Sequence, residues 1–557
     1  MPTPARRLTL ATGVALLVAL LAPIGLSAPA TADASGGVAG RPRADASAIS
    51  LGYEFGCAVV SSGAVRCWGD NGSGQLSQGN FANVGDNTGE STAVVPLPRP
   101  AVSVAAGTSF ACAILDTGQV RCWGANDYGQ LAQGNTTDIG DNPGEAAVPV
   151  PLGRRAVALT AGDSHACAVL DDGQVRCWGY NGDGELGQGN TDNVGDGLGE
   201  TTVVVSLPRR AVAVAAADYS TCAVLDTGAL RCWGENTSGE LMQGTTANVG
   251  DSLGETTVAV QTSGQAVRAI TGGNSHFCAI YADGTVHCWG YSGLGNLGLG
   301  RTANFGDDPG ETNIGATNLG GQRAVAVAAG HHHTCAVLDT GRLRCWGYNA
   351  SGQLGLGSNT SIGDDPGEST VPVDLPGPVH AVAGGSGSTC AVNDSGLRCW
   401  GDASSGQLAR GSTTGFGTGM GEVPRLLGAV ALGGQQVGRD TDGDGTRDAA
   451  DACPGVAGLL GSGCAAVLKG KKVVINVVLA KKKASAKCPA RATVKVKTRT
   501  KQGRLTVTKQ LKTKRSGAGC AVKGKVRLSA KPKKSAKTTV KITGAKLKTK
   551  RLVAVRL

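Results

Sequence analysis

The sequence has few aromatic residues and no long apolar run beyond its first residues. Aromatic side chains make up 4% of the 557 residues, whereas glycine occurs 88 times. Large helical cores need bulkier side chains and fewer glycines, so the composition favours short strands and tight turns. The chain also lacks a P-loop, a nucleophile elbow and a zinc-protease motif. We therefore expect a protein that is not an enzyme, with an enzyme built from scattered residues as an alternative.

One region of the chain has no acidic residues, and the other has no lysine. Residues 465–557 hold 30 Lys and Arg and no Asp or Glu, while the rest of the chain holds 42 acidic and 23 basic residues, all of the latter Arg. This division predicts two domains. Alternating residues in the basic region predict strands, and its size with the pair Cys488–Cys520 predicts a small Ig-like β-sandwich. Its charge predicts binding to an anionic partner, such as a cell-wall polymer, lipid headgroups or released nucleic acid, or docking on the acidic propeller of the same chain. Without interleaved aromatic residues we expect no specific nucleic-acid binding.

The first residues have the pattern of an export signal. Arg6 and Arg7 precede the apolar run 14–22, and small-residue cleavage patterns follow it. This run is too short to span a bilayer comfortably, so we expect a signal peptide at 1–34, a linker at 35–47 and no transmembrane anchor. The expected location is the cell surface or the extracellular medium.

A repeat of 54 to 57 residues fills the middle of the chain. All seven tryptophans lie in Cys-Trp-Gly triplets: Trp68, Trp123, Trp178, Trp233, Trp289, Trp346 and Trp400. Each unit contains at least three short segments rich in Val, Ile and Leu, separated by Gly-rich turns, which predict one four-stranded sheet per unit. Seven such sheets predict an all-β fold, a seven-bladed β-propeller over residues 48–436. The segment Ala429–Gly434 is an eighth copy of the inner strand, so either it or Ile49–Gly52 could close the ring.

The units resemble those of the regulator of chromosome condensation family. The matching residues include Gly162, His165, Gly173, Trp178 and Asn181, and the resemblance recurs in all seven units between Ala48 and about Gly434. It implies a seven-bladed propeller, and secreted bacterial members are similar in having cysteines at the two hairpin positions. The family's nuclear exchange activity is not expected in an exported chain, because a fold does not confer a function.

Fourteen of the 18 cysteines form seven pairs, six of them ten residues apart. Two residues that face each other across a hairpin lie within disulfide range, and export favours oxidation. The expected disulfides of the units are Cys57–Cys67, Cys112–Cys122, Cys167–Cys177, Cys222–Cys232, Cys278–Cys288, Cys335–Cys345 and Cys390–Cys399. The last pair is one residue closer in sequence, so we expect a different register there.

A calcium-binding loop is predicted after the repeats, within residues 437–464. Carboxylates occupy positions 1, 3, 5, 9 and 12 of an EF-hand-type pattern, and the residue at position 7 can offer its carbonyl. The expected ligands are Asp440, Asp442, Asp444, Thr446, Asp448 and Asp451. The stretch resembles a thrombospondin type 3 repeat, and Cys453 is then expected to pair with Cys464.

Two other groups of residues leave alternatives open. Six units carry an Asp followed by a Glu four residues later: Asp86/Glu90, Asp141/Glu145, Asp196/Glu200, Asp251/Glu255, Asp307/Glu311 and Asp364/Glu368. These carboxylates either bind cations or a basic partner, or they stabilise turns, and we favour the turns. His165, His276 and His333 occupy a position that is Phe in other units, which indicates packing, whereas a metal held by His331 and His333 is the weaker alternative.

The expected function is binding or adhesion. The propeller would recognise an unknown extracellular protein or glycan, and the basic domain would hold the chain at the surface. The alternative is an inhibitor of a secreted enzyme, because the chain is similar to the propeller-type β-lactamase inhibitors. That alternative needs an aromatic patch on one rim. Apart from the tryptophans, the main aromatic residues available for it are Tyr53, Phe55, Tyr128, Tyr180, Tyr219, Tyr291 and Tyr348.

Overall fold

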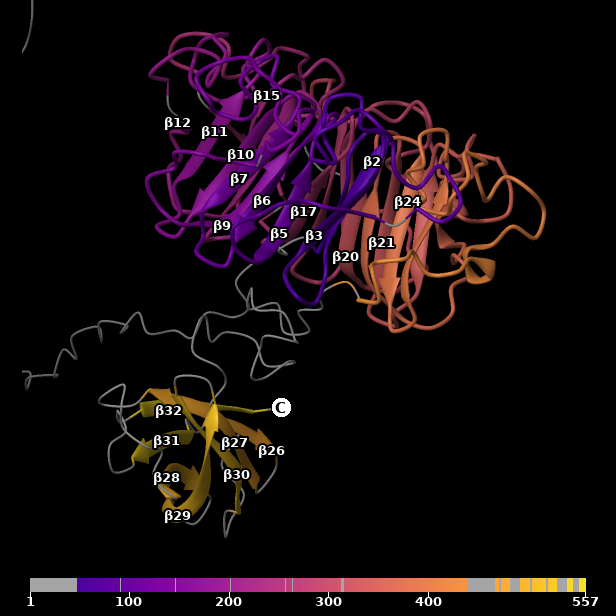
Figure 1. Cartoon of the computed structure of the whole chain (residues 1–557). Coiled ribbons are helices and arrows are strands. Elements are labelled where there is room, and N and C mark those ends of the chain that lie inside the picture. The colour runs from indigo at the N-terminus through magenta and orange to yellow at the C-terminus, as the bar shows by residue number, and fades with distance from the viewer. Residues whose placement is uncertain are drawn as a thin grey trace, which may run out of the picture. The chain divides into compact units, whose positions relative to one another are not determined.

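Seven β-sheets form a ring around a common axis in the computed structural model (Figure 1). The structure describes residues 48–437, except 91, 146, 201, 256, 263, 312–314 and 436, and the backbone of strands between 466 and 556. The innermost strands of neighbouring sheets contact one another around the whole ring, including the first and the last. The predicted seven-bladed propeller is therefore confirmed.

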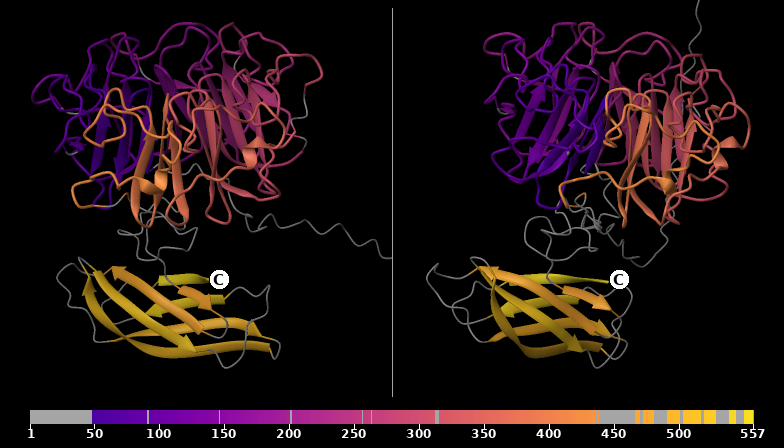
Figure 2. Two further views of the ribbon diagram at one scale, coloured as in Figure 1. Left: turned by 90° about the vertical axis from the view of Figure 1, so that its right-hand side faces the viewer. Right: turned by 45° about the vertical axis from the view of Figure 1, so that its right-hand side comes forward.

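Blades 1 to 4 each have four antiparallel strands. They form the indigo-to-magenta part of the propeller in Figure 2. They are β1 Ile49–Leu51, β2 Phe55–Val59, β3 Val65–Gly69 and β4 Ala93–Val94; β5 Ala101–Ala106, β6 Phe110–Leu115, β7 Val120–Gly124 and β8 Val148–Pro149; β9 Ala156–Ala161, β10 His165–Leu170, β11 Val175–Gly179 and β12 Val203–Val204; and β13 Ala211–Ala216, β14 Ser220–Leu225, β15 Leu230–Gly234 and β16 Val258–Val260.

Blades 5 to 7 have three strands each within the described residues. They are β17 Val267–Gly272, β18 His276–Tyr281 and β19 Val286–Gly290; β20 Ala324–Ala329, β21 His333–Leu338 and β22 Leu343–Gly347; and β23 Val379–Gly384, β24 Ser388–Asn393 and β25 Gly396–Gly401. The prediction of four strands thus holds for blades 1 to 4. Two short 3-10 helices, η1 Glu368–Thr370 and η2 Pro424–Leu426, lie in the outer connections of blades 6 and 7.

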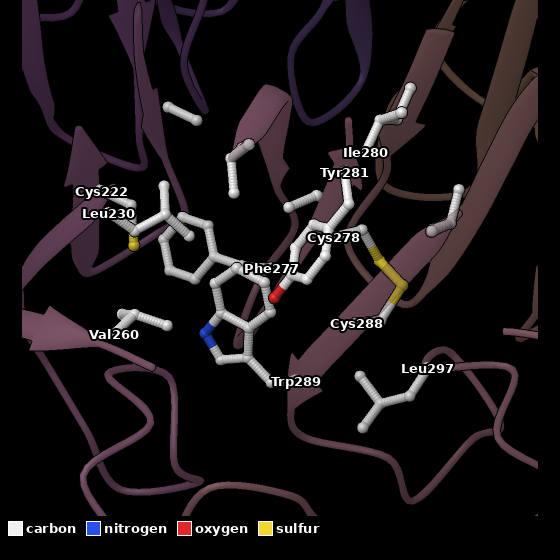
Figure 3. Close-up of a cluster of buried hydrophobic side chains, with 14 of the residues drawn as sticks. Cys222, Leu230, Val260, Phe277, Cys278, Ile280, Tyr281, Cys288, Trp289 and Leu297 are labelled. Carbon is white, nitrogen blue, oxygen red and sulfur yellow. A yellow bond between two sulfur atoms is a disulfide. The ribbon is translucent and has the colours of Figure 1, made fainter. Parts of the chain in front are cut away.

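The second strand of each blade is buried along almost its whole length, because it lies between two strands and between two neighbouring blades. The inner strands are rich in Ala and Val, and these small side chains allow seven strands to converge on one axis. Larger apolar side chains fill the space between blades, as Phe277 and Trp289 do with rings 5.9 Å apart (Figure 3).

The tryptophans join each blade to the one before it. Every indole nitrogen donates a hydrogen bond of 2.7 to 3.1 Å to a backbone carbonyl of the preceding blade. Trp68 of blade 1 donates to Gln407 of blade 7, so this series closes the ring. Each bond satisfies a buried polar group that would otherwise be costly to bury.

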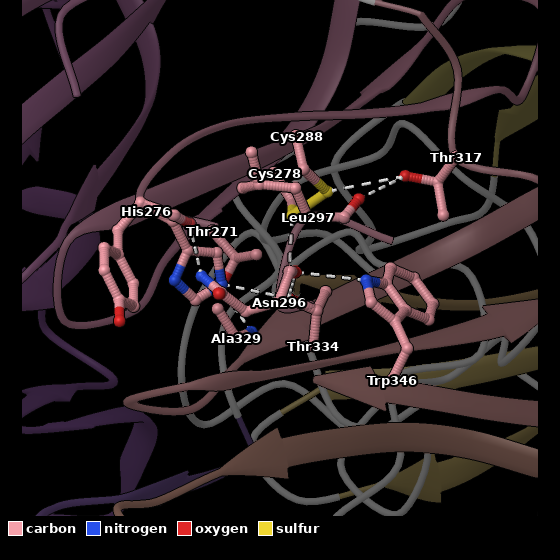
Figure 4. The surroundings of a disulfide bond; sticks show 11 residues. Thr271, His276, Cys278, Cys288, Asn296, Leu297, Thr317, Ala329, Thr334 and Trp346 are labelled. Carbon is pink, nitrogen blue, oxygen red and sulfur yellow. Dashed lines mark hydrogen bonds between the residues drawn. A yellow bond between two sulfur atoms is a disulfide. The ribbon is translucent and has the colours of Figure 1, made fainter. Parts of the chain in front are cut away.

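The seven predicted disulfides of the propeller are present, each between the second and third strands of a blade. Their Cα atoms lie 4.0 to 4.1 Å apart, as expected for directly opposed residues. Figure 4 shows the surroundings of Cys278–Cys288, where Thr334 donates to the Asn296 carbonyl at 2.9 Å. The expected change of register at Cys390–Cys399 is wrong. Cys390 still faces Cys399 and Thr389 still faces Trp400, because the shorter turn between Asn393 and Gly396 absorbs the missing residue.

The first strand, rather than residues 429–434, supplies the inner strand that completes the ring. Ile49–Leu51 pairs with Phe55–Val59, whereas Val430 donates its N–H to Leu397 at the outer edge of blade 7. The interpretation of Ala429–Gly434 as an inner strand is therefore wrong. The chain then returns to blade 1, where Val437 forms a bridge with Val60.

The basic region contains seven strands within its described residues. They are β26 Ala466–Lys469, β27 Lys472–Ala480, β28 Arg491–Thr500, β29 Gly503–Ser516, β30 Gly519–Arg527, β31 Thr538–Thr543 and β32 Lys550–Arg556. They pair in the closed order β26-β27-β30-β29-β28-β31-β32. The Ig-like sandwich stays a prediction for this region.

Candidate recognition face

A channel of about 650 Å³ follows the axis of the propeller, lined by the inner strands. At one end, each inner strand turns into the second strand of its blade, and the turn residues surround the channel mouth. These equivalent residues are Tyr53, Thr108, Asp163, Asp218, Asn274, His331 and Ser386. Backbone hydrogen bonds connect neighbouring turns, such as Asp163 N–H to the Asp218 carbonyl at 3.0 Å and Ser386 N–H to the Tyr53 carbonyl at 3.3 Å. These hydrogen bonds therefore fix the positions of the turns around the mouth relative to one another.

Six of the seven tyrosines lie at this end of the propeller. We call this end, with the turns around the channel mouth and the residues that follow Cys-Trp-Gly, the recognition face. Three follow a Cys-Trp-Gly triplet, two lie in the turns at the mouth, and Tyr128 lies in the loop after a triplet. Tyr128, Tyr180 and Tyr219 form an edge-to-face series with ring centroids 5.0 and 6.2 Å apart. The seventh, Tyr281, is buried in a hairpin.

A second aromatic group lies across the mouth. Tyr53 contacts His331, which contacts His332, and His332 in turn contacts Tyr291 and Tyr348. Burial lowers the pKa of both histidines, so both are neutral at neutral pH. The sequence analysis named these six tyrosines and Phe55 as the residues available for an aromatic patch on one rim. All six tyrosines lie at this end of the propeller, whereas Phe55 is buried between blades.

The charged residues at the mouth positions and after Cys-Trp-Gly are acidic. Asp218 accepts a hydrogen bond from Asn274 at 2.5 Å and lies 3.6 Å from His331, and burial followed by the charge of Asp163 raises its pKa to about 7. Burial and then Asp163 also raise the pKa of Tyr219 to about 12. Neither Lys nor Arg occupies any of the seven mouth positions or the seven positions after Cys-Trp-Gly. The sequence analysis missed these acids, and aligning the units by position would have revealed them.

The histidines predicted to serve packing do so. The Nε2 atoms of His165, His276 and His333 lie 2.8 to 2.9 Å from a threonine hydroxyl of the next blade. All three are fully buried, and burial lowers their pKa to between about 3 and about 4. His333 contacts Thr389, whereas His331 contacts Tyr53, and the described residues contain no group of three or more side chains arranged to hold a metal. The geometry thus gives no support to a metal held by His331 and His333.

The glutamates of the outer loops stabilise turns. Glu90 accepts hydrogen bonds from the backbone N–H groups of Gly85 and Asn87 at 2.8 and 3.0 Å, and the same contact with the preceding Gly recurs in five other loops. For these glutamates, the favoured interpretation as turn residues therefore agrees with the geometry.

Several predicted features lie outside the described residues. They are the signal peptide and linker, the calcium ligands Asp440, Asp442, Asp444, Thr446, Asp448 and Asp451, and the cysteines Cys453, Cys464 and Cys488. Within the described part of the chain, no helix has the length and apolar character needed to cross a bilayer.

Comparison with known proteins identifies relatives of the propeller. A family model of the RCC1-like domain matches residues 31–367. The ultraviolet-B receptor UVR8 of Arabidopsis thaliana is 29% identical over 397 residues, covering 69% of this chain and 82% of the receptor. The E3 ubiquitin-protein ligase HERC2 of Homo sapiens is 29% identical over 317 residues, covering 54% of this chain but 6% of the ligase. Yeast RCC1 (Prp20), solved with Kap60 bound, is 19% identical with a TM-score of 0.53, covering 69% of this chain and 85% of that one, which supports the fold alone.

Proposed function

This chain belongs to the RCC1-like domain family, and we propose that it is a non-enzymatic propeller that recognises an extracellular protein through its recognition face. The observation that carries the proposal is the gathering of six tyrosines at one end of the ring. Tyrosine is enriched at protein interfaces because it offers a large, stiff apolar ring with one polar atom. Tyr53 and Tyr128 are more than 40% exposed, so the face presents such rings to a partner.

The architecture of the mouth supports protein recognition as well. The turns that carry Tyr53, Asp218 and His331 are braced by backbone hydrogen bonds, so little conformational entropy is lost when a partner docks.

We propose that the chain acts outside the cell. The expected signal peptide supports export, and seven disulfides in one domain suit an oxidising compartment. The 30 basic residues of the last domain would hold the chain on an anionic cell-wall polymer. A calcium ion bound by Asp440, Asp442, Asp444, Asp448 and Asp451 would order the connection between the domains, because this set of hard oxygen donors suits calcium.

Inhibition of a secreted enzyme, such as a β-lactamase, is the second candidate. It uses the same recognition face, since an inhibitor also needs an exposed aromatic surface. An extracellular enzyme ranks last, because the histidines that contact threonine hydroxyls are fully buried together with those threonines, out of reach of a substrate.

Capture from the producing organism's cell envelope and culture fluid tests the proposal. We would compare the full-length protein with a chain that ends at Val437, each with and without a calcium chelator. The shorter chain keeps the contacts of residues 431–437 with blade 1. We expect both chains to retain the same protein, and only the full-length chain to bind cell walls, in a manner lost at high salt. Capture that depends wholly on the basic domain would contradict the proposal.

A further inference from the structure

A pair of residues five positions apart recurs beneath the recognition face. The first residue follows Cys-Trp-Gly, and the second precedes a buried Leu in every unit. The pairs are Asp70/Gln75, Ala125/Gln130, Tyr180/Glu185, Glu235/Glu240, Tyr291/Asn296, Tyr348/Gln353 and Asp402/Gln407. In blade 1, Gln75 Nε2 donates to Asp70 at 2.6 Å, and in blade 7, Gln407 Nε2 donates to Asp402 at 2.8 Å. In these blades the buried amide thus supplies the donor for the carboxylate.

Blades 3 and 4 replace this amide with a carboxylate. Glu185 and Glu240 are fully buried, and one oxygen of each accepts a backbone N–H at 2.9 and 2.8 Å. Gln75 uses its own oxygen in the same way, so the second glutamate oxygen takes the place of the amide nitrogen. That oxygen, Oε1, has no hydrogen-bond partner in either residue. A buried carboxylate oxygen without a donor is destabilising, and a positive group would relieve it.

The surroundings of these two glutamates contain more negative charge and two phenol rings. Glu235 is half-buried, and its backbone N–H donates to the Tyr219 carbonyl at 2.8 Å. The rings of Tyr180 and Tyr219 lie 6.2 Å apart at an interplanar angle of 72°. Burial raises the pKa of Glu185 to about 8 and of Glu240 to about 7, and every charged neighbour that raises them further is a carboxylate. The cluster therefore lacks a compensating cation among the groups that shift it.

We propose that Tyr180, Tyr219 and Glu235, with Glu185 and Glu240 buried behind them, bind a cationic side chain of the protein partner, arginine above all. A guanidinium carries several N–H donors, pairs with a carboxylate and stacks on aromatic rings. It would thus supply the positive charge that this part of the face lacks. The inference rests on the proposed function, since it assigns the chemistry of the partner to the same surface.

Fluorine NMR of the full-length protein labelled with 3-fluorotyrosine tests the inference. The chain has seven tyrosines, and each signal is assigned by a Tyr→Phe variant. The probe is the peptide Gly-Ser-Arg-Ser-Gly, and its control carries citrulline, which keeps the shape of arginine but not its charge. We expect the arginine peptide to shift the signals of Tyr180 and Tyr219 and the citrulline peptide to leave them in place.

Matched variants separate the cluster from acidity in general. Glu235→Gln and Glu240→Gln should each weaken binding of the arginine peptide by about tenfold, because each removes negative charge from the cluster. Asp402→Asn changes the residue of blade 7 that is equivalent to Glu235, and Gln407 already donates a hydrogen bond to it. This variant should weaken binding of the arginine peptide by less than about twofold. Glu240→Gln installs the residue that positions 75, 130, 353 and 407 already carry, so the fold should be retained.

Equal shifts from both peptides, or equal losses in Glu235→Gln and Asp402→Asn, would overturn the inference. If the shorter chain still captures its protein in that case, only the cationic partner group is refuted. If the propeller captures no protein at all, the proposed function itself fails.

Discussion

Single positions within the repeat show which side chains serve the fold and which depart from it. Glu185 and Glu240 stand where four other units carry glutamine. Their carboxyls have raised pKa values in the folded protein, chiefly because of burial, so the folded state holds their protons more tightly than the unfolded chain does. Their contribution to stability is complete below about pH 4.5 and is lost as the pH rises through about 8 for Glu185.

Glu185→Gln should therefore stabilise the protein in alkaline solution. At pH 9 we expect the free energy of unfolding to rise by about 2 kcal/mol, because the variant removes a buried charge that the wild type must carry. At pH 4.5 the two proteins should unfold at nearly the same denaturant concentration. Denaturant unfolding across this pH range makes the measurement, and an equal gain at both values would show that charge is not the cause.

The buried histidines illustrate a second rule at the residue scale. Where a blade carries His165, the next blade carries Thr221, and the two are hydrogen-bonded, whereas Phe110 is followed by Ala166 at the same two positions. A large side chain in one blade thus corresponds to a residue of fitting size and polarity in the next.

A double-mutant cycle measures this match. Thr221→Ala should cost about 1–2 kcal/mol, because it leaves the buried His165 nitrogen without its partner. His165→Phe should cost about 1–3 kcal/mol by overpacking against Thr221. The double variant, which recreates the Phe110–Ala166 pair, should recover at least about 1 kcal/mol of the summed loss. Strict additivity in unfolding experiments would show that the two positions do not interact.

At the scale of elements, the hairpins follow from the sequence and the outer connections do not. The spacing of cysteines and the Gly-containing turns predicts the second and third strands and their register, because opposed cysteines must meet. The seventh hairpin was mispredicted because a deletion can be absorbed within a turn without moving the strands. Residues 429–434 were mispredicted because an Ala-Val sequence suits both an inner strand and an outer edge, and only the pairing of Val430 with Leu397 distinguishes them.

Removing one hairpin disulfide should be tolerated. For Cys112→Ala with Cys122→Ala we expect a loss of about 1–3 kcal/mol, since the bridge closes a short loop that cross-strand pairing already holds. The ring should remain folded, because the indole hydrogen bonds of Trp123 and Trp178 still join the blades. Thermal unfolding under oxidising conditions makes the test, and loss of the folded state at room temperature would mean that the disulfides are needed for folding itself.

At the scale of the whole molecule, ring closure and the recognition face arise from contacts between residues far apart in sequence. Trp68 contacts Gln407 where the first blade meets the last. Tyr53 contacts His331 across the channel mouth. The sequence predicts the number of blades and the supply of tyrosines. It does not predict that Asp218 lies beside His331, because that depends on the angle between blades.

The central claim is that the partner docks on the recognition face. The most direct measurement compares the capture of protein by two double variants of the full-length chain. Tyr180→Ser with Tyr219→Ser changes the face, whereas Leu198→Ser with Leu253→Ser changes outer-loop residues that are 95% and 98% exposed. Capture should fall by at least about tenfold in the tyrosine variant and stay within about twofold in the leucine variant, since interface tyrosines often act as hot spots. Unchanged capture by the tyrosine variant, or loss in the leucine variant alone, would contradict the account.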